Sequence, residues 1–245
     1  MLVFPISHQM DWFFMKKLSV FVVGFILLFS VACAAVSDGG KDKQDLERVD
    51  FIHFKKAGKH DGKPGAALCY KLMGVKWNTL PAGYVINPSN PDSLSEGFVA
   101  SAISTAAETW DGSTSAELFN NGYSIDYSAQ YGVQDYRNSI AFGSYRDSGV
   151  IAVTSIWYSK KTKEIKEFDI LFNTYYPWGD ATVNPAVMDL ENIATHELGH
   201  GIGLDDIYTA SCSAVTMYGY SDNGDLEKRT LEAPDVTGLQ KIYGQ

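Results

Sequence analysis

The chain has 245 residues, a formal net charge of −9 and 45% hydrophobic residues, values that are ordinary for a globular protein. The acidic balance argues against nucleic acid and anionic lipid as partners, because both carry negative charge themselves. The composition also excludes a collagen-like, coiled-coil or disordered chain. Without an N-terminal export segment, about 210 residues remain, which suits one domain with a sizeable core.

The N-terminus has the pattern of an export signal. Two lysines precede the uncharged, mostly apolar run of residues 18–31, and small residues follow it. We therefore predict a signal peptide over residues 1–34, with Met15 as an alternative start, and secretion of the mature chain. Because ~20 apolar residues can span a bilayer, the alternatives are a membrane anchor over residues 18–37 or lipidation at Cys33.

The next stretch is polar and rich in lysine, aspartate and glycine. Such a composition predicts a linker or a short propeptide-like extension over residues 35–74, with little core of its own. His53 and His60 lie in it, and we interpret both as surface histidines. The folded domain is expected over residues 75–245.

Cysteine usage agrees with export. If Cys33 leaves with the signal, only Cys69 and Cys212 remain. An even cysteine count in an exported chain predicts a disulfide between these two. The alternative is a pair of buried free thiols.

A helical period covers residues 95–110 of the expected folded domain. Its apolar residues recur at the spacing of one helix face. They are Val99, Ala102, Ile103, Ala106 and Trp110. Asp92 or Ser93 is expected to cap this helix, since both side chains can accept a backbone N–H bond.

Strands are predicted over residues 75–86, 139–145, 150–158 and 165–173, from their β-branched and aromatic content. The last two are joined by a short polar connection, which indicates a hairpin.

Two further helices are predicted in the last third of the chain. Asn184 followed by proline resembles a cap and a first helical position, so we expect a helix to begin there. Gly201 and Gly203 should end it. A short final helix is expected over residues 234–243.

The candidate metal-binding and catalytic residues lie on the first of these two helices. His196 and His200 are four residues apart, so both imidazoles can reach one ion from the same helix face. Glu197 lies beside them, where it can take a proton from a zinc-bound water whose pKa the metal lowers to ~7. A catalytic zinc needs a third protein ligand. The nearest candidate is an acid just after Gly203, because glycine lets the chain turn back.

The pattern H-E-x-x-H-x-x-G-x-x-D, which runs from His196 to Asp206, resembles that of the metzincins, zinc proteases with a methionine-containing turn. The resemblance assigns Asp206 as the third ligand, where most members have histidine and snapalysin-like enzymes have aspartate. It places Met217 beneath the metal. Asp205, one residue short of the ligand position, is expected to be a solvated acid or to contact a ligand residue. The closing segment is similar to the last helix of matrixins, and there Asp235 would hydrogen-bond near the catalytic helix.

This resemblance implies an α/β fold with a mixed, twisted five-stranded sheet, two long helices and a small C-terminal subdomain that holds the Met-turn and the final helix. It also implies a metalloendopeptidase with one catalytic Zn²⁺ and Glu197 as general base. Calcium is not indicated, and a monomer is expected.

Protein or peptide substrates would add as a strand to residues 150–158 at the sheet edge, so that Val153 and Tyr218 contact them. The alternative to an enzyme is an exported or membrane-anchored binding or adhesion module that keeps the metal as structure. A second alternative is hydrolysis of a non-protein amide.

Overall fold

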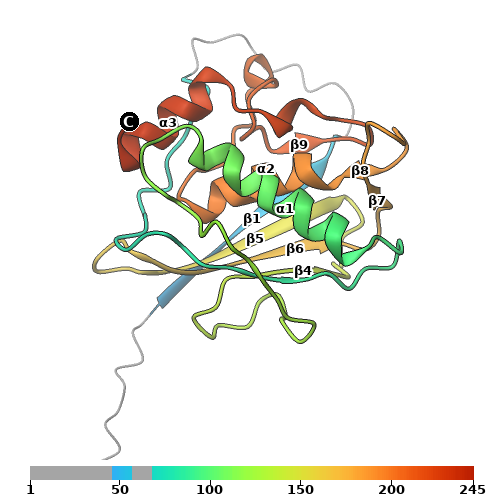
Figure 1. Ribbon diagram of the computed structural model, residues 1–245. Helices are drawn as coiled ribbons and strands as arrows, with labels where there is room; N and C mark the ends of the chain where they lie inside the picture. Colours follow the sequence, from blue (N-terminus) through green and yellow to red (C-terminus); the bar gives the residue numbers. More distant parts are fainter. Residues whose placement is uncertain (1–45, 57–67) are drawn as a thin grey trace, which may run out of the picture. The chain divides into compact units, whose positions relative to one another are not determined.

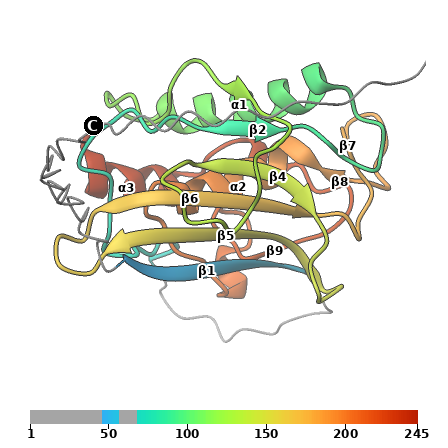
Figure 2. The same cartoon turned by 90° about the horizontal axis from the view of Figure 1, so that it is seen from below.

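A twisted seven-stranded sheet forms one layer of the protein (Figure 2). The computed structural model describes residues 46–56 and 68–245, which belong to the compact unit Lys43–Gln245. The predicted signal peptide, the alternative anchor, Cys33 and His60 lie outside the described residues. Within them, no helix has the length and apolar character needed to cross a membrane.

The sheet combines parallel and antiparallel strands. In their order across the sheet, its members are β3 (Ser124–Ile125), β2 (Val85–Asn87), β4 (Ser139–Gly143), β6 (Ile165–Asn173), β5 (Val150–Ser159), β1 (Leu46–Lys55) and β9 (Tyr220–Ser221). A separate pair is formed by β7 (Trp178–Gly179) and β8 (Met188–Asp189). The predicted hairpin is confirmed, because β5 and β6 pair antiparallel. The segment 75–86, predicted as a strand, joins the sheet only at its end, in β2.

The long helices α1 (Glu96–Asp111) and α2 (Leu190–Gly201) cover the same face of the sheet (Figure 1). The predicted apolar stripe of α1 is buried against α2 and the sheet. Its cap is Ser95, whose hydroxyl accepts a hydrogen bond from the backbone N–H of Phe98, and not Asp92 or Ser93. The final helix α3 (Ala233–Tyr243) lies where the sequence predicts it.

The predicted start of α2 was wrong. Asn184 closes a local turn, in which its side chain accepts a bond from Ala186 N–H. The helix begins at Leu190, capped by Asp189, whose carboxylate accepts from Asn192 N–H at 2.9 Å. Asp189 also pairs with Arg229. This cap is therefore held by a residue far along the chain, and a local pattern does not reveal it. The end of α2 at Gly201 is as predicted.

The prediction of a linker fails for residues 46–55. They form β1, which pairs antiparallel with β5 from Leu46 opposite Ser159 to Phe54 opposite Val150, and parallel with β9. The strand β5 therefore has a neighbour on each side, and the prediction that residues 150–158 lie at the sheet edge is wrong. The predicted disulfide between Cys69 and Cys212 is confirmed.

Candidate metal centre and catalytic site

Three side chains converge where α2 ends. The Nε2 atoms of His196 and His200 are 3.2 Å apart, and Asp206 Oδ1 is 3.3 Å from the first and 3.5 Å from the second. The helix spacing aligns the two imidazoles. Gly203, with φ of +100°, then turns the chain back, and a Cβ there would collide with the carbonyl oxygen of Val75. Only glycine permits this return, which brings the carboxylate to the rings.

The hydrogen bonds made by the two histidines leave their facing ring nitrogens free to bind a cation. His196 Nδ1 donates to the carbonyl oxygen of Thr216 at 2.7 Å, and His200 Nδ1 donates to that of Leu204 at 2.9 Å. In neutral rings these bonds place both free lone pairs on the facing Nε2 atoms. Asp206 Oδ1 is buried and has no hydrogen-bond partner. Two imidazoles and one carboxylate form a ligand set that suits zinc.

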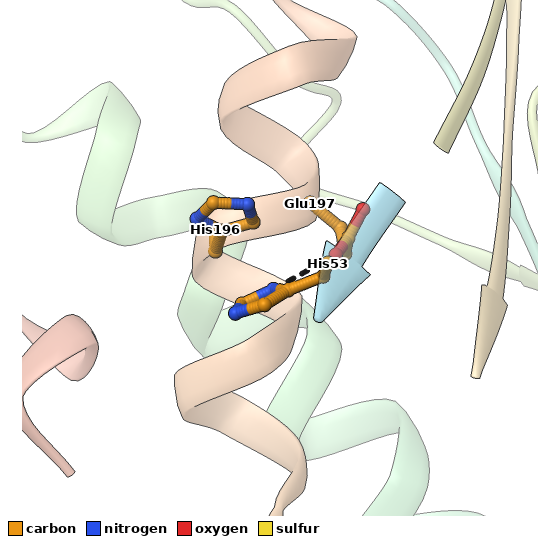
Figure 3. A group of neighbouring side chains, drawn as sticks. All are labelled: His53, His196 and Glu197. Atoms are coloured by element: carbon orange, nitrogen blue, oxygen red, sulfur yellow. Dashed lines mark hydrogen bonds and ion pairs between the residues drawn. The ribbon is translucent and has the colours of Figure 1, made fainter. Parts of the chain in front are cut away.

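Glu197 lies beside this group and is fully buried. Burial raises the pKa of its carboxyl to about 7. Its Oε2 accepts a bond from Thr154 Oγ1 at 2.5 Å, and its Oε1 is 3.1 Å from His53 Nδ1 (Figure 3). A carboxyl group with this pKa can both accept and return a proton near neutral pH.

Met217 lies under the helix that carries the histidines. A Cβ added to Gly199 would collide with Met217 Sδ, so glycine at this position allows the thioether to pack against the helix backbone. Asp235 on α3 fixes the turn by accepting bonds from Thr216 N–H at 2.8 Å and Met217 N–H at 3.2 Å. The final helix is thus attached to the turn beneath the candidate metal site.

A neighbouring tyrosine side chain holds the Asp206 carboxylate in place. Tyr208 Oη donates to Asp206 Oδ2 at 2.9 Å, which leaves Oδ1 directed at the two imidazoles. The sequence does not mark Tyr208, because a tyrosine two residues after an aspartate is not a recognised metal-site motif.

His53 is not a surface histidine, which corrects the expectation. The side chain of His53 is fully buried, and its ring packs against that of His196 with centroids 4.0 Å apart (Figure 3). Burial and the neighbouring cationic groups lower its pKa well below the usual value, so the ring is neutral. One tautomer satisfies both nitrogens: Nδ1 donates to Glu197, and Nε2 accepts from Ser221 Oγ at 3.0 Å and Lys228 Nζ at 3.2 Å.

Lys228 closes the space beyond His53. Its exposed fraction is 4%, and Nζ also donates to the carbonyl oxygen of Tyr218. Burial lowers the pKa of Lys228 to about 7. His53, Ser221 and Lys228 come from three separate segments, so no sequence spacing links them. Only the short β-like run around His53 could have drawn attention to one of them.

The strand β1 covers the whole arrangement. Phe51 stacks on the His200 ring with centroids 4.3 Å apart, and the side chains of His196, Glu197 and His200 have no exposed surface. Val153, expected to contact substrate, lies opposite Ile52 of β1. Tyr218, the other expected contact, is buried at 5% exposure.

Comparison with known proteins gives one family. The family model described as Matrixin matches residues 76–244. Matrix metalloproteinase-16 of Homo sapiens is 24% identical over 216 residues, which is 82% of this chain and 34% of that protein. The hatching enzyme of Paracentrotus lividus is 23% identical, over 82% of this chain and 31% of its own length. Human matrilysin is 42% identical over 52 residues, 21% of this chain and 18% of its own. The chain thus spans about a third of the first two relatives.

Proposed function

Because the chain belongs to the matrixin family, we propose that it is a zinc-dependent endopeptidase. His196, His200 and Asp206 would hold the ion. The observation that carries this proposal is the buried Asp206 Oδ1, which lacks a partner and faces two imidazole nitrogens. When bound, zinc would polarise the scissile carbonyl and acidify water.

The protein groups around the ion have distinct roles in this reaction. Glu197 accepts a proton from the attacking water and later gives it to the leaving amine. Thr154 Oγ1, which donates to Glu197 Oε2, orients this carboxylate. Met217 and Asp235 do not touch the reacting atoms. They support the helix and the turn that position the catalytic side chains.

We also propose that the N-terminal extension of residues 35–74 is a propeptide whose inhibitory part is β1. Peptides commonly bind proteases and other partners by adding a strand to an exposed sheet edge. In this chain β1 takes that place on β5, runs on to β9, and leaves the catalytic side chains without exposed surface. A substrate would therefore need β1 to leave first.

Export follows as a further part of this proposal. The disulfide between Cys69 and Cys212 is typical of a protein that folds in an oxidising compartment. The proposed substrates are proteins or peptides, and the proposed form is a monomer.

Chelation tests the reaction. A sequence-specific protease site placed directly after Lys56 allows the folded chain to be cut and β1 to be released. The cut chain should hydrolyse casein, lose this activity with a zinc chelator, and regain it when zinc is added back. A cut chain that binds zinc but cleaves neither casein nor a peptide library would favour the binding or adhesion module instead.

Metal analysis tests the third ligand. Asp206→Asn should weaken zinc binding by more than about a hundredfold, since even outer-shell changes cost 10–100-fold. The matched control is Asp205→Asn, because Asp205 pairs with Lys71, accepts from Asp206 N–H through an oxygen that asparagine keeps, and is not among the converging ligand atoms. Zinc content after dialysis against a series of chelator concentrations measures the zinc affinity of both variants. Equal affinity in the two variants would assign the third ligand to another residue.

A further inference from the structure

The side chain of His53 fills a polar pocket next to the candidate metal site. We define the His53 pocket by its four lining side chains, which are the His196 ring, the Glu197 carboxylate, Ser221 Oγ and Lys228 Nζ. Lys228 and Ser221 contact the far nitrogen of the imidazole, and Glu197 contacts the near one. The pocket thus has a cationic end and an anionic entrance.

The cationic end lacks a matching anion. Among the described residues, no carboxylate oxygen lies within 4.0 Å of Lys228 Nζ, whereas Lys55, Lys71 and Arg229 each have one within that distance. In the closed structure Nζ contacts the carbonyl oxygen of Tyr218 and one ring nitrogen each of His53 and His196. Burying a protonated lysine without a counter-charge is costly, so an anion brought into this pocket would favour the charged form of Lys228 and gain more than a neutral group does.

We propose that the His53 pocket selects a glutamate side chain in the peptide substrate. This inference rests on the proposed endopeptidase function, with the substrate lying along β5 and β9 as β1 does. At the position of His53, the substrate side chain would direct its carboxylate to Lys228 and Ser221.

Side-chain length favours glutamate over aspartate. The carboxylate oxygens of glutamate are separated from Cα by as many bonds as Nε2 of histidine, so they reach Ser221 and Lys228. Those of aspartate match the nearer Nδ1, which faces the Glu197 carboxylate at 3.1 Å. Aspartate would meet a like charge there, and an apolar side chain would leave Lys228 without a counter-charge.

Synthetic peptides with the sequence of β1 test the preference. The series copies residues 48–56 with Glu, Gln, Asp or Leu in place of His53, and the full chain cut after Lys56 is the enzyme. Pairs of peptides compete in one reaction, so the ratio of kcat/KM does not depend on the fraction of active enzyme. We expect Glu to exceed Gln and Leu by about tenfold or more, the worth of one charge-assisted hydrogen bond. A peptide with Glu one position earlier, in place of Ile52, is the control and should gain nothing.

The enzyme variant Lys228→Met should erase the preference for Glu over Gln. Cleavage of all peptides at similar kcat/KM, or an unchanged preference in Lys228→Met, would overturn the pocket assignment while leaving the proposed function intact.

A second measurement needs no proteolysis, so it decides the matter even if no peptide is cut. In the intact chain, His53→Glu should unfold at a higher temperature than His53→Gln, and this difference should disappear when Lys228→Met is added. If His53→Glu is no more stable than His53→Gln, Lys228 does not receive a carboxylate in this pocket and the inference fails.

Discussion

Replacing Glu197 by Gln should lower kcat of the cut chain by about 10²–10⁴-fold, the usual contribution of a general acid–base group. Glutamine keeps the shape of the side chain, so it preserves the bond from Thr154, but it cannot accept the proton of the attacking water. Zinc content should stay at the wild-type level, because Glu197 is not among the three converging ligands. Initial rates on casein and metal analysis of the same samples measure the two effects.

The matched control is Glu108→Gln, on the exposed side of α1 and away from the site. This control variant should leave both the rate of casein hydrolysis and the zinc content unchanged. If the Glu197→Gln enzyme kept full activity with normal zinc, the proton would have to be carried by another group, and the proposed role of Glu197 would be wrong.

Cutting the chain after Lys56 should raise its peptidase activity by about tenfold or more, because only molecules with β1 out of the site can bind substrate. The intact chain with the same inserted site, left uncut, provides the baseline. Activity on a short quenched fluorescent peptide before and after the cut measures the change. The Glu197→Gln chain, cut in the same way, should show no such rise, which assigns the added activity to this site.

A milder change should act in the same direction without a cut. Arg48 of β1 donates to Ser155 Oγ of β5 at 3.0 Å, so Arg48→Ala removes a side-chain bond between the two strands. The uncut Arg48→Ala chain should be more active than the uncut parent. Equal activity of cut and uncut chains, with β1 shown to have dissociated, would remove the propeptide role.

The sequence predicted those parts of the fold whose residues are close in the chain. The stripe of α1, the β5–β6 hairpin and the spacing of His196 and His200 are local patterns, and the structure has them where expected. The turn that brings Asp206 to the rings also depends on a local feature, Gly203. Such patterns are readable because helix and strand periodicity is encoded within a few residues.

The parts that could not be predicted depend on partners far away in the chain. Residues 46–55 contain several charged residues of the kind found in a solvated linker, yet Arg48 and Asp50 pair with each other and with Ser155. Lys228 is a single buried cation in a polar segment, and only the folded chain shows that it lies beside His53. Tertiary context decided both outcomes, and local composition did not encode it.

The covalent connection between β1 and the rest of the chain has a consequence for activation. While it is intact, the strand competes with substrate at an effective concentration in the millimolar range that short tethers provide, whatever the amount of protein in solution. Once it is cut, the same strand is an ordinary free peptide whose occupancy falls as the solution is diluted. In a concentrated sample proteolysis would therefore activate only part of the enzyme, and dilution would release the strand from the rest.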